Sequence, residues 1–329
     1  MSEGSVTPQH PLGSSFGRGS AALDVVAGVD LRGKTAVVTG GYSGLGLETV
    51  RALAAAGARV VVPARRREHA REVILAAGLQ TDAVTVAALD LADQESVKEF
   101  VAGFLAANAT LDILINNAAV MASPERRVGP GWESQFATNH LGHYTLVNAL
   151  WPALAAAGTA RVVSLSSTGH KLSPIRFDDP HFDTGYDKWI AYGQAKTANS
   201  LFAVELDRLG KSAGVRAFAV HPGGIMTELQ RHLPKEEMVA LGWMDAAGKV
   251  REGFKTPEQG AATSVWAATS GALDGLGGVY CEDCDIARPT DQASPLARYQ
   301  GVDAHAVDPD AAKRLWALSA DMTGVNAFG

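Results

Sequence analysis

Short runs of β-branched residues alternate along this chain with alanine-rich stretches long enough to form helices. Parallel strands need crossover connections, which helices supply, so the alternation predicts an α/β domain built on a parallel sheet. We expect seven strands with helices between them. The expected strands span residues 35–39, 59–63, 83–88, 113–116, 161–165, 215–220 and 278–281, and the expected helices span 46–56, 94–107, 132–156, 189–209 and 257–270.

Domain organisation follows from where the alternation starts and stops. Residues 1–29 begin with a stretch rich in Gly, Ser and Pro and are expected to form a flexible extension. Residues 30–286 carry the alternation as one domain, which residues 225–254 interrupt as a mobile insertion. Residues 287–329 are expected to form a C-terminal extension with a short helix near residues 311–318.

Composition excludes several classes of protein. The chain has 329 residues, 47% of them hydrophobic and 19% charged, with a formal net charge of -6. A nucleic-acid partner would require a basic patch, so none is expected. The sequence has no apolar run of membrane-spanning length and no signal-peptide pattern, so we expect a cytoplasmic protein without a membrane partner.

Cys281 and Cys284 are the two cysteines, spaced as Cys-x-x-Cys. A zinc site would need four ligands, and no second Cys/His cluster at ligand spacing accompanies the pair. A redox dithiol usually begins a helix, whereas residues 278–281 have the pattern of a strand. We therefore expect two reduced thiols and no metal site.

A glycine-rich segment follows the first expected strand directly. Glycines allow the backbone to approach a pyrophosphate closely, and the following helix N-terminus offers N–H donors. The alternative is a turn that binds nothing, but its position after the first strand argues against that. A Walker nucleotide loop is excluded because no Lys-Ser/Thr pair follows. The expected cofactor-binding residues here are Gly40, Tyr42, Ser43, Gly44, Leu45 and Gly46.

Arginines end the second expected strand. An acid at this place usually binds the ribose 2′-hydroxyl of NAD, whereas an arginine accommodates the 2′-phosphate of NADP. No Asp or Glu precedes Arg65 in the loop after this strand, so we expect NADP, with NAD as the alternative. Arg66 and Arg67 could simply be solvated at a helix start.

Tyr192 and Lys196 are spaced to lie on one face of a helix. A nearby positive charge favours the phenolate, so the pair predicts a tyrosine whose pKa is lowered for acid–base chemistry. Such pairs also occur by chance on solvated helix faces, and the meaning of this one depends on the other motifs.

With these motifs in this order, the chain resembles the short-chain dehydrogenase/reductase family over about residues 30–285. The segment 139–143 (Asn-His-Leu-Gly-His) and an acidic, aromatic insert at 177–189 are similar to the retinol-dehydrogenase-like group. The resemblance implies a Rossmann-type, doubly wound sheet with helices on both faces. It also implies further cofactor-binding residues: Asp90, Leu91, Asn117, Ala118, Ala119, Tyr192, Lys196, Pro222, Gly223, Ile225 and Thr227. Ala119 departs from the family pattern, which has glycine at this position.

The resemblance assigns four catalytic residues: Asn139, Ser167, Tyr192 and Lys196. Tyr192 would be the general acid/base and Lys196 would lower its pKa while binding the cofactor ribose. Ser167, favoured over Ser166, would donate to the substrate oxygen. Asn139 would fix a water that connects Lys196 to solvent.

The expected function is interconversion of an alcohol and a ketone or aldehyde with NADP(H), on a hydrophobic or aromatic small-molecule substrate. Enone or imine reduction with the same site, and a non-catalytic NADP-binding sensor or scaffold, remain alternatives. By resemblance, we expect a homodimer or homotetramer with helices 132–156 and 189–209 at the interface, and the insertion as a lid over the substrate. The lid's apolar residues would line the pocket or pack the lid onto its domain: Met226, Leu229, Leu233, Met238, Leu241, Trp243 and Met244.

Overall fold

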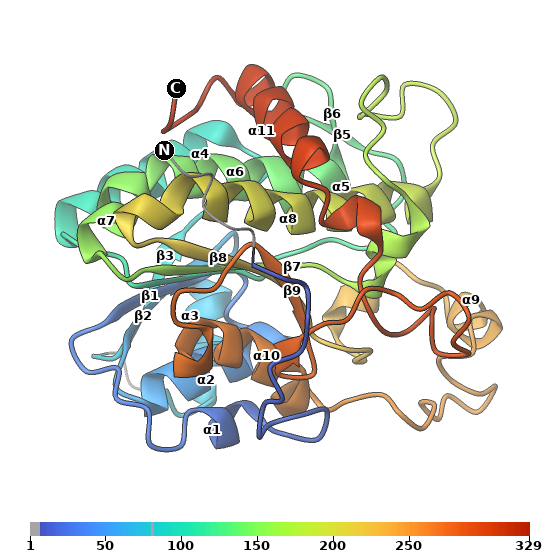
Figure 1. Cartoon of the computed structure of the whole chain (residues 1–329), viewed down its shortest axis with the longest axis horizontal. Coiled ribbons are helices and arrows are strands. Elements are labelled where there is room, and N and C mark those ends of the chain that lie inside the picture. The colour runs from blue at the N-terminus through green and yellow to red at the C-terminus, as the bar shows by residue number, and fades with distance from the viewer. Residues whose placement is uncertain (1–6, 80–81) are drawn as a thin grey trace.

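A central sheet with helices on both faces organises the computed structural model, which describes residues 7–79 and 82–329 (Figure 1). Its strand order is β10-β9-β8-β7-β4-β1-β2-β3, and the sheet is parallel except for β10. The expected doubly wound α/β fold is therefore confirmed. Its strands are β1 (Thr35–Val38), β2 (Arg59–Ala64), β3 (Val84–Ala88), β4 (Ile113–Asn116), β7 (Arg161–Leu165), β8 (Arg216–His221), β9 (Val279–Glu282) and β10 (Asp285–Ile286).

The eighth strand, β10, was not expected. It pairs antiparallel with β9 across a tight turn in which Asp283 and Cys284 have φ of 48° and 58°. Such positive φ values are uncommon outside glycine, so neither residue indicated a turn in the sequence. The expected count of seven strands is correct only for the parallel part of the sheet.

The two faces of the sheet bury alternate residues of each strand. Ala36 and Val38 pack into one hydrophobic core, and Val37 between them packs into the other. Side chains alternate in this way along any strand, so a sheet covered on both faces needs continuous apolar runs. The helices on the Val38 face are α1 (Ala22–Val25), α2 (Gly44–Ala55), α3 (Arg67–Ala76) and α10 (Pro257–Thr269), and those on the Val37 face include α4 (Gln94–Ala107), α6 (Gly142–Ala149), α7 (Trp151–Ala157) and α8 (Lys188–Gly210).

The segment 132–156 is not the single helix that the sequence predicts. Residues 127–133 form a hairpin of β5 (Arg127–Val128) and β6 (Trp132–Glu133), followed by α5 (Ser134–Phe136) and a π-helical turn over Ala137–Leu141. Helix α6 then ends at Ala149, and α7 begins with Pro152 in its first turn. Proline lacks the N–H that would continue a helix, which explains the break. Helix α3 was also missed.

The N-terminal extension lies against the sheet edge over residues 7–20, in contrast to the expected flexible tail. The Gln9 side chain donates to the carbonyl oxygens of Tyr280 and Ala287, both at 2.7 Å. The Asp285 carboxylate accepts three backbone N–H bonds from Leu12, Gly13 and Ser14. These bonds hold the segment beside β9 and β10. Residues 1–6 lie outside the described part of the chain.

The C-terminal extension forms a longer helix than expected, α11 (Pro309–Thr323), which packs on α6 and α8 (Figure 1). Trp316 stacks on Phe202 with ring centroids 5.6 Å apart and lies 4.9 Å from the Tyr144 ring. Both partners belong to helices expected at a subunit interface. Helix α11 of the same chain covers the parts of these surfaces around Tyr144 and Phe202. The interface and the oligomeric state stay predictions.

The insertion 225–254 projects from the carboxyl end of β8 and contains a 3-10 turn (Glu228–Gln230) and α9 (Lys235–Ala240) (Figure 1). We call residues 225–254 the lid. Within residues 7–79 and 82–329, no helix combines the length and apolar character needed to cross a bilayer.

Candidate active site

A cavity of about 1490 Å³ runs along the carboxyl ends of the parallel strands, where open α/β sheets bind their ligands. Every expected cofactor-binding residue lines it, and so does Ser167. Asn139 does not. The lining includes Gly40, Tyr42, Ser43, Gly44, Leu45, Gly46, Arg65, Asp90, Leu91, Asn117, Ala118, Ala119, Ser167, Tyr192, Lys196, Pro222, Gly223, Ile225 and Thr227.

The glycine loop has no room for side chains where it turns into α2. A Cβ on Gly46 would lie 2.4 Å from the carbonyl oxygen of Gly40 and 2.6 Å from Nδ2 of Asn117. The side chain of Ser43, the N-cap residue of α2, makes no capping hydrogen bond. An uncapped helix N-terminus beside a glycine turn is suited to an anion, so this end of the cavity fits the pyrophosphate of a dinucleotide.

Thr39 organises the segment opposite the glycine loop, a role that the sequence analysis missed. Its hydroxyl accepts N–H bonds from Asn117 and Ala118, both at 2.9 Å, and lies 2.9 Å from Nε2 of His143. Burial lowers the pKa of His143 to about 4, so its ring is neutral. Nδ1 bonds the carbonyl oxygen of Asn139, which leaves Nε2 to accept from Thr39. The sequence did offer one indication of this role, because the hydroxyl of Thr39 directly precedes the two glycines that begin the loop.

The carboxyl end of β2 presents two exposed arginines to the cavity, Arg65 and Arg66. Among the described residues, neither forms an ion pair with a carboxylate. Asp90, which also lines the cavity, accepts the backbone N–H of Ala92 at 3.0 Å. Unpaired guanidinium groups at this position suit a phosphate better than a ribose hydroxyl.

Tyr192 and Lys196 lie one turn apart on α8, as predicted, but their electrostatics differ from the prediction. Nζ of Lys196 lies 5.6 Å from the Tyr192 ring centroid and donates to the carbonyl oxygen of Leu165 at 2.9 Å. Burial raises the pKa of Tyr192 to about 12, opposed by a hydrogen bond with Ser167. Burial also lowers the pKa of Lys196 to about 7, which weakens its charge near neutral pH. The expected lowering of the tyrosine pKa is therefore not found.

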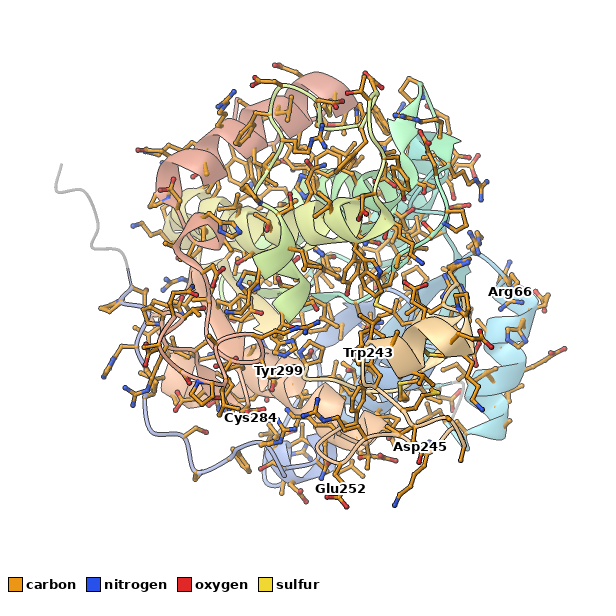
Figure 2. All side chains as sticks on the ribbon, turned by 90° about the vertical axis from the view of Figure 1, so that its right-hand side faces the viewer. Arg66, Trp243, Asp245, Glu252, Cys284 and Tyr299 are labelled. Atoms are coloured by element: carbon orange, nitrogen blue, oxygen red, sulfur yellow. The ribbon has the colours of Figure 1, made fainter. Side chains whose placement is uncertain are left out.

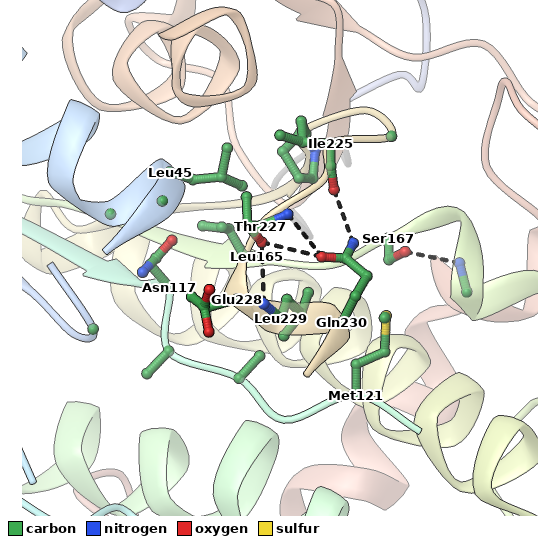
Figure 3. A pocket seen from close by; sticks show the side chains of 18 of the residues that line it. Leu45, Asn117, Met121, Leu165, Ser167, Ile225, Thr227, Glu228, Leu229 and Gln230 are labelled. Atoms are coloured by element: carbon green, nitrogen blue, oxygen red, sulfur yellow. Dashed lines mark hydrogen bonds between the residues drawn. The ribbon is translucent and has the colours of Figure 1, made fainter. Parts of the chain in front are cut away.

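The two serines after β7 differ in their partners. The Ser166 hydroxyl donates to the carbonyl oxygen of Lys196 at 2.8 Å and is fully buried. Ser167 instead caps the 3-10 turn Thr168–Leu172, where its hydroxyl accepts the N–H of Gly169 at 3.0 Å (Figure 3). One lone pair and the hydroxyl proton of Ser167 remain beside Tyr192.

Asn139 lies behind the cavity wall, within the π-helical turn. Its amide clamps the backbone of Val120 from both sides: Oδ1 accepts the Val120 N–H at 2.8 Å and Nδ2 donates to the Val120 carbonyl at 2.9 Å. Val120 itself lines the cavity. Asn139 is thus placed to hold that wall, and its role in a water relay stays a prediction.

The lid begins against the glycine loop, since a Cβ on Gly44 would lie 3.2 Å from Cγ2 of Thr227. Gln230 folds back onto the carbonyl of Ile225 and the N–H of Thr227, both at 2.8 Å (Figure 3). Leu229, Leu241 and Trp243 line the cavity as expected. Leu233 and Met238 instead pack the lid onto Met121, Tyr192 and Trp189.

Both extensions also reach the cavity, which no local sequence pattern indicated. Arg18 comes from the N-terminal segment, and Leu296, Arg298 and Tyr299 come from the C-terminal one. Figure 2 shows Trp243 of the lid and Tyr299 near the centre of one face of the molecule. Arg66 lies at the right-hand edge of the same view. The cavity therefore has a nucleotide end near Arg65 and a second end where lid and extensions meet.

Comparison with known proteins agrees with this geometry. A family model described as short chain dehydrogenase matches residues 34–238. A Streptomyces lividans protein named as a probable oxidoreductase is 48% identical over 298 residues, covering 89% of this chain and 98% of the relative. Human retinol dehydrogenase 11 is 37% identical over 301 residues, covering 90% of this chain and 88% of its own.

Solved structures show the same fold. An uncharacterised protein from Mycobacterium paratuberculosis has a TM-score of 0.71 and 32% identity, covering 94% of this chain and 99% of its own. The Pseudomonas aeruginosa protein RhlG, in an active-site complex with NADP, has a TM-score of 0.59 and 25% identity, covering 77% of this chain and 95% of its own.

Proposed function

The chain belongs to the short-chain dehydrogenase/reductase family, and from this premise we propose that it interconverts a ketone or aldehyde and an alcohol with NADP(H). The observation that carries the proposal is the meeting of Tyr192, Ser167 and Lys196 in one cavity with the glycine loop. A sensor would need only the loop. A relative named retinol dehydrogenase 11 supports an alcohol or aldehyde as substrate, since retinol is an alcohol.

The nicotinamide cofactor supplies the hydride when bound, and the protein manages the proton. With a pKa of about 12, Tyr192 holds its proton at neutral pH and is ready to donate it to a carbonyl oxygen. Ser167, beside it, donates a hydrogen bond to the same oxygen and stabilises the developing charge. Lys196 is a further donor toward the cofactor ribose, and Asn139 is a positioning residue that acts through Val120.

The protonation state of Tyr192 favours the reductive direction. Oxidation of an alcohol would need the phenolate, of which only about 10⁻⁵ is present at pH 7 when the pKa is about 12. From about pH 6 to 8, we expect kcat/KM for oxidation to rise about tenfold per pH unit relative to that for reduction.

NADP is the proposed cofactor because Arg65 and Arg66 reach the nucleotide end of the cavity without carboxylate partners. An NADP-bound neighbour supports the same choice. NAD is usually bound through a carboxylate that accepts from its ribose hydroxyls, and residues 64–67 at the end of β2 carry no carboxylate.

A substrate panel tests the function. NADPH oxidation should be followed with hydrophobic aldehydes and ketones, enones and imines, and each product identified by mass. The proposal expects alcohols from the carbonyl compounds. Saturated ketones or amines would favour the enone or imine alternative. Tight NADPH binding with no turnover of any class would favour a sensor.

A further inference from the structure

Resting on the proposed function, we propose that the substrate carries a carboxylate at the end opposite its reacting carbonyl. The structure assigns this group to Arg251 of the lid and Arg298 of the C-terminal extension, which flank Tyr299 at the second end of the cavity. The substrate would be an amphiphile with an apolar or aromatic body.

The two guanidinium groups gather around one exposed ring. Cζ of Arg251 lies 5.8 Å from the Tyr299 ring centroid, and Cζ of Arg298 lies 5.9 Å from it. In the described part of the chain, neither arginine has a carboxylate partner. A guanidinium beside a ring keeps the N–H edges with which it binds carboxylates in a bidentate way. Both arginines therefore have N–H donors available to bind an anion.

Three aromatic rings in contact lead from the proton donor toward this anion end. Trp189 lies 6.4 Å from the Tyr192 ring, and Trp243 lies 5.9 Å from Trp189. The carbonyl of Trp243 then accepts the backbone N–H of Arg251 at 2.9 Å. A molecule that places its carbonyl at Tyr192 and its body along the tryptophans would place its far end near Arg251.

The charge around this half of the cavity is positive. Lys171 is paired with Asp303 at 3.0 Å, and Asp283 is paired with Lys255 at 2.7 Å. Four arginines then face two glutamates, a surplus of two positive charges: Arg18, Arg231, Arg251 and Arg298 against Glu228 and Glu252. Figure 2 shows Glu252 at the lower edge of the molecule, away from Tyr299 and Trp243. The field at this end therefore attracts an anion.

The test compares each carboxylate with its neutral ester. Benzoylalkanoates of increasing chain length and their methyl esters serve as ketone substrates with NADPH. Phenylalkanoates and their esters, which hold no ketone, serve as binding probes followed by tryptophan fluorescence. The variants are Arg251→Gln and Arg298→Gln. Lys249→Gln is the matched control because Lys249 is exposed on the same lid segment and does not line the cavity.

Each arginine variant should raise the KM and Kd for carboxylates about tenfold while changing the values for esters less than about twofold. Lys249→Gln should change neither, and the Kd for NADPH should stay constant in all variants. Equal use of ester and carboxylate by the wild type, or a matching loss for both in the variants, overturns this inference. A weakened NADPH Kd would assign the arginines to the cofactor and also overturn it. If no ketone is reduced but probe carboxylates bind through Arg251, the proposed function fails and the anion site stands.

Discussion

Replacing Gly46 with alanine should remove cofactor binding through one misplaced methyl group. The new Cβ would lie 2.4 Å from the Gly40 carbonyl oxygen and 2.6 Å from Nδ2 of Asn117. Side chains essentially never approach closer than 3.0 Å, so the loop must move by roughly 0.6 Å. Asn117 cannot yield freely because the same nitrogen donates to the Thr39 carbonyl at 2.8 Å. Overpacking of this kind costs about 1–3 kcal/mol.

The expected loss in NADP affinity is about tenfold to a hundredfold, since about 1.4 kcal/mol corresponds to a factor of ten. Thermal unfolding with and without NADP measures it. Ligand at about 100 times its Kd stabilises a protein by about 2.7 kcal/mol, and a hundredfold weaker Kd leaves about 0.4 kcal/mol. The variant should therefore show almost no NADP-induced rise in Tm.

Gly103→Ala is the matched control. Gly103 lies in the exposed part of α4 with open space around it, so alanine should stabilise the helix by about 0.5–1 kcal/mol and leave the NADP shift intact. If Gly46→Ala instead keeps the wild-type NADP affinity, the tight approach of loop and Asn117 is not what shapes this site.

Other consequences can be checked independently. Arg65→Asp should raise the KM for NADPH at least about tenfold and lower that for NADH, and unchanged cofactor selectivity would contradict the role of Arg65. Asp283→Asn should destabilise the fold by about 3 kcal/mol in urea unfolding, because Lys255 is left buried without its partner, and adding Lys255→Met should restore most of that loss. Acid should lower the unfolding free energy between about pH 6.5 and pH 4, by about 2 kcal/mol per buried histidine at pH 5. Burial holds the pKa of each of these histidines in the folded protein at about 3 or 4, so the unfolded chain takes up the proton first. Constant unfolding free energy over that range would refute the buried, neutral state of His140, His143, His170 and His221.

The sequence predicted the parallel sheet and many of the residues that line the cavity, because both depend on local patterns. Strand β4 and helix α4, for example, begin and end at the same residues as the apolar run 113–116 and the helical stretch 94–107. The break before α7 could have been predicted from Pro152, because proline is tolerated in the first turn of a helix but not in its interior. The glycine loop was readable because the backbone requirement is local to those residues.

Other features depend on contacts between distant segments and could not be read in the same way. The path of residues 7–20 depends on bonds such as those from Gln9 to the carbonyl oxygens of Tyr280 and Ala287, which are 271 and 278 positions away. The covering of Phe202 by Trp316 is equally non-local. The pKa of Tyr192 depends on how deeply α8 is buried, whereas its spacing from Lys196 shows only that the two residues are neighbours.

Carbonyl reduction at this site requires Tyr192 to donate the proton. The direct measurement is single-turnover NADPH oxidation by Tyr192→Phe, with NADPH Kd measured on the same sample. We expect an unchanged Kd and a rate lower by about 10²–10⁴, because a positioned acid contributes that much and the phenyl ring keeps the shape of the cavity wall. A rate within a few-fold of the wild type would contradict it.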